Sequence, residues 1–155
     1  ELTRADVVVF PGGIGTRTLI GDKQVLDWVR MVHRHTRFTT SVCTGSLVLA
    51  AAGLLTGLTA TTHWRAVELL ESLGARYVPQ RVVEHLPQRV LTAAGVSSGI
   101  DMALRLVELL AGRDAAEAAQ LMIEYDPQPP FDAGAVAKAP EATRHLAEDY
   151  FRHRS

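Results

Sequence analysis

Cys43 is the only cysteine in this 155-residue sequence, and it lies at the junction between a predicted strand and a predicted helix. The run Phe38-Thr39-Thr40-Ser41-Val42 is typical of a buried strand, while residues 44–52 begin with small side chains and continue as an apolar helix. A side chain at such a junction points out of the end of the sheet, beside the positive end of the helix dipole, which favours a thiolate. Because a single cysteine is more often an inert apolar residue, its position alone leaves both interpretations open.

A glycine-rich loop, residues 11–15, follows the apolar run 7–10. It lacks the third glycine of a dinucleotide-binding fingerprint, because position 18 is threonine. Two interpretations remain: a backbone nest, in which the N–H groups of Gly12 and Gly13 bind a polarised atom, or a tight turn without a ligand. Since the C-terminal ends of parallel strands meet at one edge of a sheet, we expect this loop to share a crevice with Cys43.

His63 and Thr44 are the polar residues expected nearest to the cysteine. His63 ends the next predicted strand, so it can approach Cys43 as a polar partner or proton carrier; alternatively, it caps the following helix or packs beside Trp64. Thr44 directly follows the cysteine and can point its hydroxyl into the crevice, although threonine is also common at helix N-termini. Asp101 falls within a predicted helix, where a solvated or salt-bridged position explains it.

The composition is that of a globular protein rather than a disordered one, with 47% hydrophobic and 21% charged residues. The net charge of −1 gives no basic field for nucleic acid. No histidines are spaced as a ligand set, so we predict no metal site, and nothing calls for a cofactor. No apolar run reaches membrane-spanning length and no signal peptide is recognised. A lone cysteine cannot form an internal disulfide, which favours a cytoplasmic location.

Strands and helices alternate along the chain, which predicts an α/β fold with a parallel sheet sandwiched by helices. We expect a single domain over 1–155, in which the segment 127–140 connects a C-terminal tail helix at about 140–153. Asp22 and Asp114 are the expected N-caps of two helices. The predicted strands cover 7–10, 38–42, 59–62, 77–78, 81–83 and 89–93, and the predicted helices cover about 23–35, 44–52, 64–74, 97–111, 114–125 and 140–153.

Motifs spread over nearly the whole chain resemble the ThiJ/PfpI superfamily, which shares the class-I glutamine amidotransferase-like fold. The tail over 123–134 is similar to that of isocyanide hydratases. The other matching motifs are Pro11-Gly12-Gly13, Ser41-Val42-Cys43-Thr44-Gly45-Ser46, Ala50-Ala51-Ala52-Gly53-Leu54-Leu55, Ala60-Thr61-Thr62-His63-Trp64 and Ala94-Gly95-Val96-Ser97-Ser98-Gly99-Ile100-Asp101.

The resemblance implies a flavodoxin-like fold, usually as a homodimer, in which Cys43 is a nucleophile held in a strained backbone conformation. Thr44 matches the threonine that follows the cysteine in the hydratases; the PfpI-type peptidases have histidine there, so the peptidase activity is disfavoured. His63 matches the family histidine on the strand after the nucleophile. Gly12 and Gly13 match the loop that offers backbone N–H groups to the pocket. The implied activity is cysteine-dependent conversion of a small isocyanide into an N-formamide through a thioimidate.

One departure from the family pattern concerns the start of the chain. Members carry a strand–helix–strand unit before the strand at 7–10, and this unit bears the acidic residue that hydrogen-bonds the cysteine sulfur. We therefore expect the 155 residues to be a fragment of the full domain, with the acid supplied by the missing unit.

Two alternative functions remain open at this stage. The same motifs occur in the ligand-sensing domain of AraC-type transcriptional regulators, in which a helix-turn-helix domain follows; only one short helix follows the proline-rich segment here, so this chain is not expected to bind nucleic acid itself. The other alternative is a redox or stress-response member of the superfamily, because an exposed, reactive cysteine oxidises readily.

Overall fold

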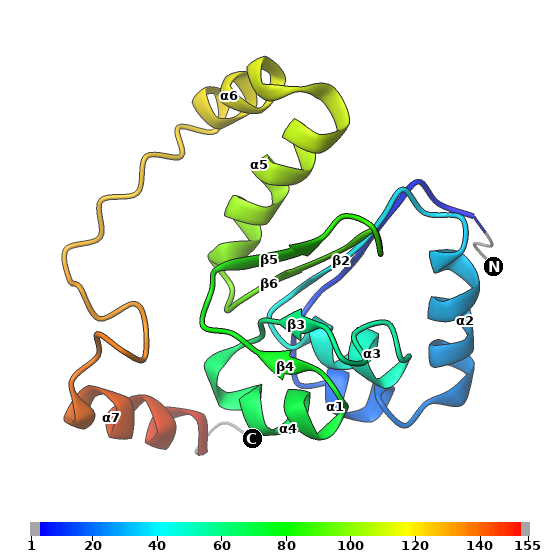
Figure 1. Ribbon diagram of the computed structural model, residues 1–155. Helices are drawn as coiled ribbons and strands as arrows, with labels where there is room; N and C mark the ends of the chain where they lie inside the picture. Colours follow the sequence, from blue (N-terminus) through cyan, green and yellow to red (C-terminus); the bar gives the residue numbers. More distant parts are fainter. Residues whose placement is uncertain (1–3, 153–155) are drawn as a thin grey trace. The chain divides into compact units, whose positions relative to one another are not determined.

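The computed structural model describes residues 4–152, and the chain divides into two compact units, Glu1–Gln120 and Leu121–Ser155 (Figure 1). The strands are β1 (Val7–Phe10), β2 (Phe38–Val42), β3 (Thr59–Ala60), β4 (Arg76–Tyr77), β5 (Val82–His85) and β6 (Val90–Ala93). The helices are α1 (Thr16–Leu19), α2 (Lys23–His33), α3 (Gly45–Ala51), the 3-10 turn η1 (Trp64–Ala66), α4 (Val67–Ser72), α5 (Ser98–Ala111), α6 (Arg113–Met122) and α7 (Glu141–Arg152).

The first unit is built on a four-stranded sheet in the order β1-β2-β6-β5, which confirms the predicted α/β fold. β1 pairs in parallel with β2, and β2 pairs in parallel with β6. β5 runs antiparallel to β6, a departure from the expected parallel sheet. The cause is the short connection 86–89, because so few residues can join only antiparallel neighbours. The predicted strand at 59–62 ends after two residues, and β3 pairs with β4 in a separate two-stranded sheet.

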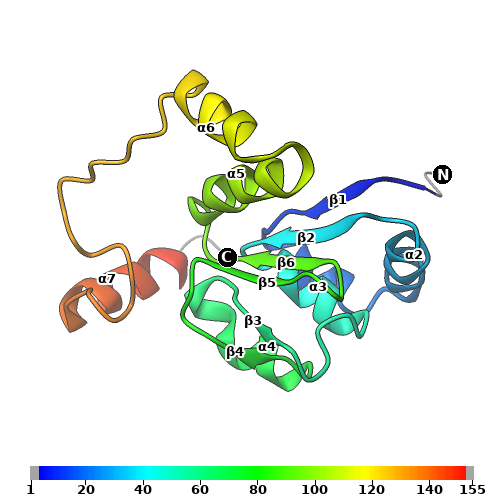
Figure 2. The same cartoon turned by 45° about the horizontal axis from the view of Figure 1, so that its top comes forward.

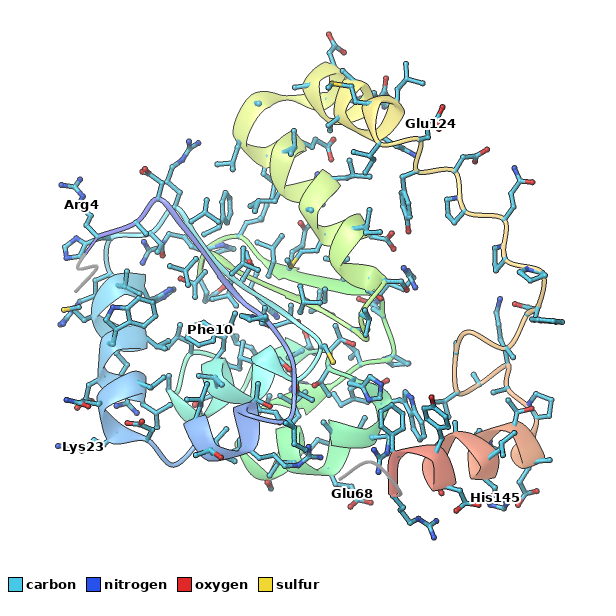
Figure 3. All side chains as sticks on the ribbon, turned by 180° about the vertical axis from the view of Figure 1, so that it is seen from behind. Arg4, Phe10, Lys23, Glu68, Glu124 and His145 are labelled. Carbon is cyan, nitrogen blue, oxygen red and sulfur yellow. The ribbon has the colours of Figure 1, made fainter. Side chains whose placement is uncertain are left out.

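Helices cover both faces of the main sheet (Figure 2). α3 packs on β1 and β2, and α2 packs on α3; on the other face, α5 packs on β5 and β6. Phe10, labelled in Figure 3, ends β1, and its ring meets that of Trp28 in an edge-on arrangement at 6.1 Å. The core on the α3 side consists of fully buried aliphatic side chains, among them Val29, Leu47, Val48, Leu49, Leu55, Leu70 and Val90.

Of the two predicted helix N-caps, Asp22 is observed and Asp114 is not. The carboxylate of Asp22 accepts hydrogen bonds from the backbone N–H groups of Gln24 at 2.9 Å and Val25 at 3.2 Å, as an N-cap does. Asp114 lies in the first turn of α6, because that helix already begins at Arg113. The prediction that Asp114 is the N-cap is therefore wrong.

β1 lies at the edge of the four-stranded sheet. Its central Val9 is 50% exposed, although the strand is apolar throughout. An edge strand presents backbone N–H and C=O groups that a further strand can pair with. The apolar composition of β1 is more typical of a strand covered on both faces.

The second unit contains the proline-rich segment and α7. Residues 126–130 are not helical, as their prolines predict. The predicted tail helix at 140–153 is observed as Glu141–Arg152, and residue 153 lies outside the described residues. Across residues 4–152, none of the helices is both long enough and apolar enough to cross a membrane.

The contact between α3 and the end of β1 leads to a stability prediction for Gly45. A Cβ atom on Gly45 would clash with the carbonyl oxygen of Phe10 and lie 2.9 Å from that of Pro11. We expect Gly45→Ala to lower the free energy of unfolding in urea by about 1–3 kcal/mol, because α3 must move away from β1. Gly21→Ala is the control: its Cβ would lie 3.7 Å from the nearest atom, the oxygen of Thr18. Equal stability of the two variants would contradict this packing.

Candidate active site

The backbone of Cys43 adopts a conformation that side chains rarely take. Its φ is +58°, in the left-handed region, directly after β2 and two residues before α3. This conformation costs a non-glycine residue about 1–2 kcal/mol. Cys43 forms no disulfide and is partly exposed rather than fully buried in the core. A strained and accessible cysteine at a strand-to-helix turn has the geometry of a nucleophile.

Hydrogen bonds hold both backbone groups of Cys43. Its N–H donates to the carbonyl oxygens of Ala93 at 3.0 Å and Ala94 at 2.9 Å, at the end of β6. Its own carbonyl oxygen accepts from the hydroxyl groups of Ser46 and Thr62, each at 3.1 Å. The strained residue is thus fixed by three segments of the chain. Sequence reasoning did not identify Ser46 or Thr62, which were noted only as parts of the motifs.

The glycine loop lies directly against the sulfur. A Cβ atom placed on Gly12 would lie 2.6 Å from Cβ and 2.9 Å from Sγ of Cys43, and 3.0 Å from the backbone nitrogen of Thr44. Only a hydrogen atom fits at this position. The loop and the cysteine therefore lie at the same edge of the sheet, as the rule for parallel strands predicts.

Thr44 joins the loop to Cys43. Its buried hydroxyl accepts a hydrogen bond from the N–H of Gly13 at 2.9 Å and lies 3.2 Å from the Gly13 carbonyl oxygen, to which it can donate. The hydroxyl that we expected to point into the crevice is thus engaged with the loop. The Gly13 N–H, one of the two donors of the predicted nest, is occupied by this hydroxyl in the structure.

His63 makes the contacts expected if it caps the following helix and packs beside Trp64. Its Nδ1 accepts from the backbone N–H of Arg65 at 3.3 Å, as the cap of η1, and its ring lies 5.7 Å from that of Trp64. Because Nδ1 accepts, a neutral ring carries its proton on Nε2. The ring also lies beside Gly95, where an added Cβ would be 3.1 Å from Cδ2. Gly95 follows Ala94, whose carbonyl oxygen accepts a hydrogen bond from the Cys43 N–H, so His63 lies at the same end of the sheet as Cys43.

Burial lowers the pKa of His63 below 6.5, and the nearby charges of Arg65 and Arg17 lower it further. The folded protein therefore favours neutral His63, and this contribution to stability is complete above pH 6.5 and lost as the pH falls through the lowered pKa. We expect the free energy of unfolding, measured in urea, to fall less for His63→Gln than for the wild type when the pH is lowered from neutral to acidic. His33, whose pKa is lowered by burial and by Arg89, is present in both proteins. Identical pH dependences would show that His63 is not buried in this way.

The remaining polar candidates do not join the site. Asp101 forms an ion pair with Arg81, which agrees with the predicted salt-bridged position. Within residues 4–152, no cluster of three or more histidine, cysteine, aspartate or glutamate side chains is arranged to hold a metal ion.

Two features define the class of this protein: a flavodoxin-like α/β fold and a strained cysteine at a strand-to-helix turn. Residues 1–109 match the DJ-1/PfpI family, and the chain belongs to this family. It is 50% identical to the isonitrile hydratase of Pseudomonas putida over 137 residues, which cover 88% of this chain and 59% of the hydratase. It is 28% identical over 121 residues to the transcriptional regulator GbdR of Pseudomonas aeruginosa, covering 78% of this chain and 33% of the regulator.

Solved structures share the fold. A ThiJ/PfpI family protein from Pseudomonas syringae superimposes with a TM-score of 0.89 at 38% identity, covering 98% of this chain and 62% of that protein. DJ-1 of Schizosaccharomyces pombe superimposes with a TM-score of 0.64 at 23% identity, covering 79% of this chain and 63% of DJ-1, which shows a common fold. The chain thus spans about three fifths of the length of the hydratase, at 59%, and of the Pseudomonas syringae protein, at 62%.

Proposed function

We propose that the protein to which this chain belongs hydrates isocyanides to N-formamides, with Cys43 as the nucleophile. The observation that carries this proposal is the 50% identity to an isonitrile hydratase over 88% of the chain. The accessible, strained Cys43 beside Gly12 gives that likeness a chemical basis. The regulators are more distant relatives, with 28% identity for GbdR, and a regulatory function is not favoured.

The reaction follows from the electrophilic carbon of the isocyanide. The thiolate of Cys43 forms a bond to this carbon while a general acid gives it a proton, which yields a thioimidate, R–N=CH–S–Cys. Water then adds to the thioimidate carbon, and the C–S bond breaks. The sulfur leaves as a thiol after protonation, and R–NH–CHO is released. Covalent catalysis thus divides one slow addition of water into two easier steps.

The other predicted site residues take distinct parts in this proposal. Gly12 lets the loop lie directly against the sulfur, because any side chain at that position would clash with Cys43. Thr44 and Gly13 hold the loop against the nucleophile through their mutual hydrogen bonds. In this proposal, neutral His63, with its proton on Nε2, exchanges that proton with water or the substrate nitrogen. General acid–base help of this kind contributes about 100- to 10,000-fold.

We further propose that the whole domain is longer than the 155 residues and that an additional segment pairs with β1. Two observations support this: β1 is an apolar strand at the sheet edge with Val9 half exposed, and the relatives contain residues beyond those matched here. The acid that protonates the isocyanide carbon is assigned to that segment. We also propose that the protein acts as a homodimer in the cytoplasm, as the family resemblance and the lone cysteine suggest.

The test is direct measurement of formamide production by the full-length protein. Purified protein is mixed with an aromatic isocyanide such as p-nitrophenyl isocyanide, and the N-formamide is quantified by chromatography. The 155-residue chain alone, assayed in parallel, is expected to be much less active because it lacks the proposed acid. Absence of formamide above the uncatalysed rate with the full-length protein and a panel of alkyl and aryl isocyanides would overturn the proposed function.

A further inference from the structure

The carbonyl group of the strained nucleophile receives a hydrogen bond from a distant part of the chain. The hydroxyl of Thr62 donates to the carbonyl oxygen of Cys43 at 3.1 Å, across a separation of 19 residues. The Thr62 side chain is buried, with 1% of its surface exposed, so water does not compete for this hydrogen bond. The second hydroxyl on the same oxygen, that of Ser46, comes from the first turn of α3 and moves with it.

The segment that carries Thr62 is itself anchored to the main sheet. The N–H of Thr61 donates to the hydroxyl of Thr92 on β6 at 3.1 Å, and Thr61 is fully buried. β3, which precedes this segment, belongs to the separate two-stranded sheet. After β3, the chain is therefore attached to β6 through Thr61, and the hydroxyl of Thr62 reaches the carbonyl oxygen of Cys43.

This hydrogen bond acts on the backbone torsions that direct the sulfur. At a φ of +58°, the backbone of Cys43 is strained, so relaxation toward a common conformation is favourable. Such a relaxation rotates the peptide group that follows Cys43 and moves its carbonyl oxygen away from Thr62. The buried hydrogen bond from Thr62 opposes this relaxation, because the relaxation would break it. The residue after Thr62 is His63, so the same anchor fixes the start of the histidine-bearing turn.

We propose that Thr62 is a positioning residue, which holds Cys43 in its strained conformation by hydrogen-bonding its carbonyl and thereby keeps the sulfur beside Gly12. The expected effect on the reactivity of the thiol follows from the structure alone, whereas the expected effect on turnover rests on the proposed hydratase function. The three atoms nearest to an added Gly12 Cβ belong to Cys43 and Thr44, not to Thr62.

The test compares Thr62→Val with Thr62→Ser in the full-length protein. Valine keeps the shape of the side chain and removes the donor, whereas serine retains the donor. We expect Thr62→Val to slow alkylation of Cys43 by iodoacetamide roughly three- to tenfold, and to lower kcat by a similar factor with KM unchanged. Thr62→Ser should restore both rates to within about twofold of the wild type, since the hydroxyl is the group that matters.

Thr40→Val is the matched control. Thr40 is also fully buried and donates its hydroxyl to a backbone carbonyl, that of Val8, at the same distance of 3.1 Å. It should cost similar stability and leave the alkylation rate of Cys43 unchanged. Equal slowing in Thr40→Val and Thr62→Val would show a general loss of stability and overturn the proposal, as would wild-type alkylation in a folded Thr62→Val protein.

Two further outcomes are decided by the same measurements. If Thr62→Val does not fold, Thr62→Ala removes the same hydroxyl without placing a methyl group against the carbonyl, and its alkylation rate is judged by the same criteria. If no variant or wild type hydrates isocyanides but the alkylation pattern is as expected, the hydratase proposal fails while the positioning role of Thr62 stands.

Discussion

Replacing Cys43 by alanine is expected to lower the rate of isocyanide hydration by at least about a thousandfold, because the proposed covalent intermediate can no longer form. Cys43 is the only cysteine of the sequence, and it is partly exposed beside Gly12. The measurement is kcat/KM for formamide production by wild type and variant under identical conditions.

A folding defect must not be mistaken for loss of the nucleophile in this experiment. Cys43→Ser retains a small polar side chain at the same φ of +58°, and it should be as inactive as Cys43→Ala while unfolding at a similar urea concentration to the wild type. Hydration by a folded Cys43→Ala protein at more than about a tenth of the wild-type rate would rule out covalent catalysis by this sulfur.

Gly12→Ala should give the second largest loss of activity. The added Cβ would lie 2.6 Å from Cβ and 2.9 Å from Sγ of Cys43, so either the loop or the nucleophile must move. A displacement of about 1 Å at a reacting atom can cost about a hundredfold in rate. We expect a loss of that order in formamide production and slower alkylation of Cys43 by iodoacetamide.

Gly15→Ala is the matched control within the same loop. A Cβ on Gly15 would have no atom within 4 Å, so this variant should keep the activity and alkylation rate of the wild type. If Gly12→Ala is alkylated and produces formamide at the same rates as Gly15→Ala, the loop does not approach the sulfur this closely in solution.

Much of the fold could be predicted because the strands and helices are signalled by local patterns. The bounds of β1 and β2 match those predicted, and the Asp22 cap before α2 is observed as predicted. The strand predicted at 59–62 stops at residue 60, because the next N–H bonds to the Thr92 side chain rather than to a strand backbone. Such a side-chain acceptor leaves no periodic signal in the sequence.

The site could be predicted only in part, from the rule that the C-terminal ends of parallel strands meet at one edge of the sheet. This rule correctly brought Gly12 and Cys43 together. It did not foresee that the Thr44 hydroxyl would occupy the Gly13 N–H, 31 residues away in the sequence, or that Thr62 would hold the Cys43 carbonyl. Both are side-chain hydrogen bonds to backbone groups, which depend on the exact path of two loops rather than on residue types at fixed spacing.

The most direct test of covalent catalysis by Cys43 is rapid acid quenching of the full-length protein during isocyanide turnover, followed by mass spectrometry of the intact protein and its peptides. Because the isocyanide adds without losing an atom, the account predicts a mass increase equal to the whole substrate, located on the peptide that contains Cys43 and absent from Cys43→Ala. Steady formamide production with no such adduct on that peptide at any quench time, together with undiminished turnover by Cys43→Ala, would contradict it.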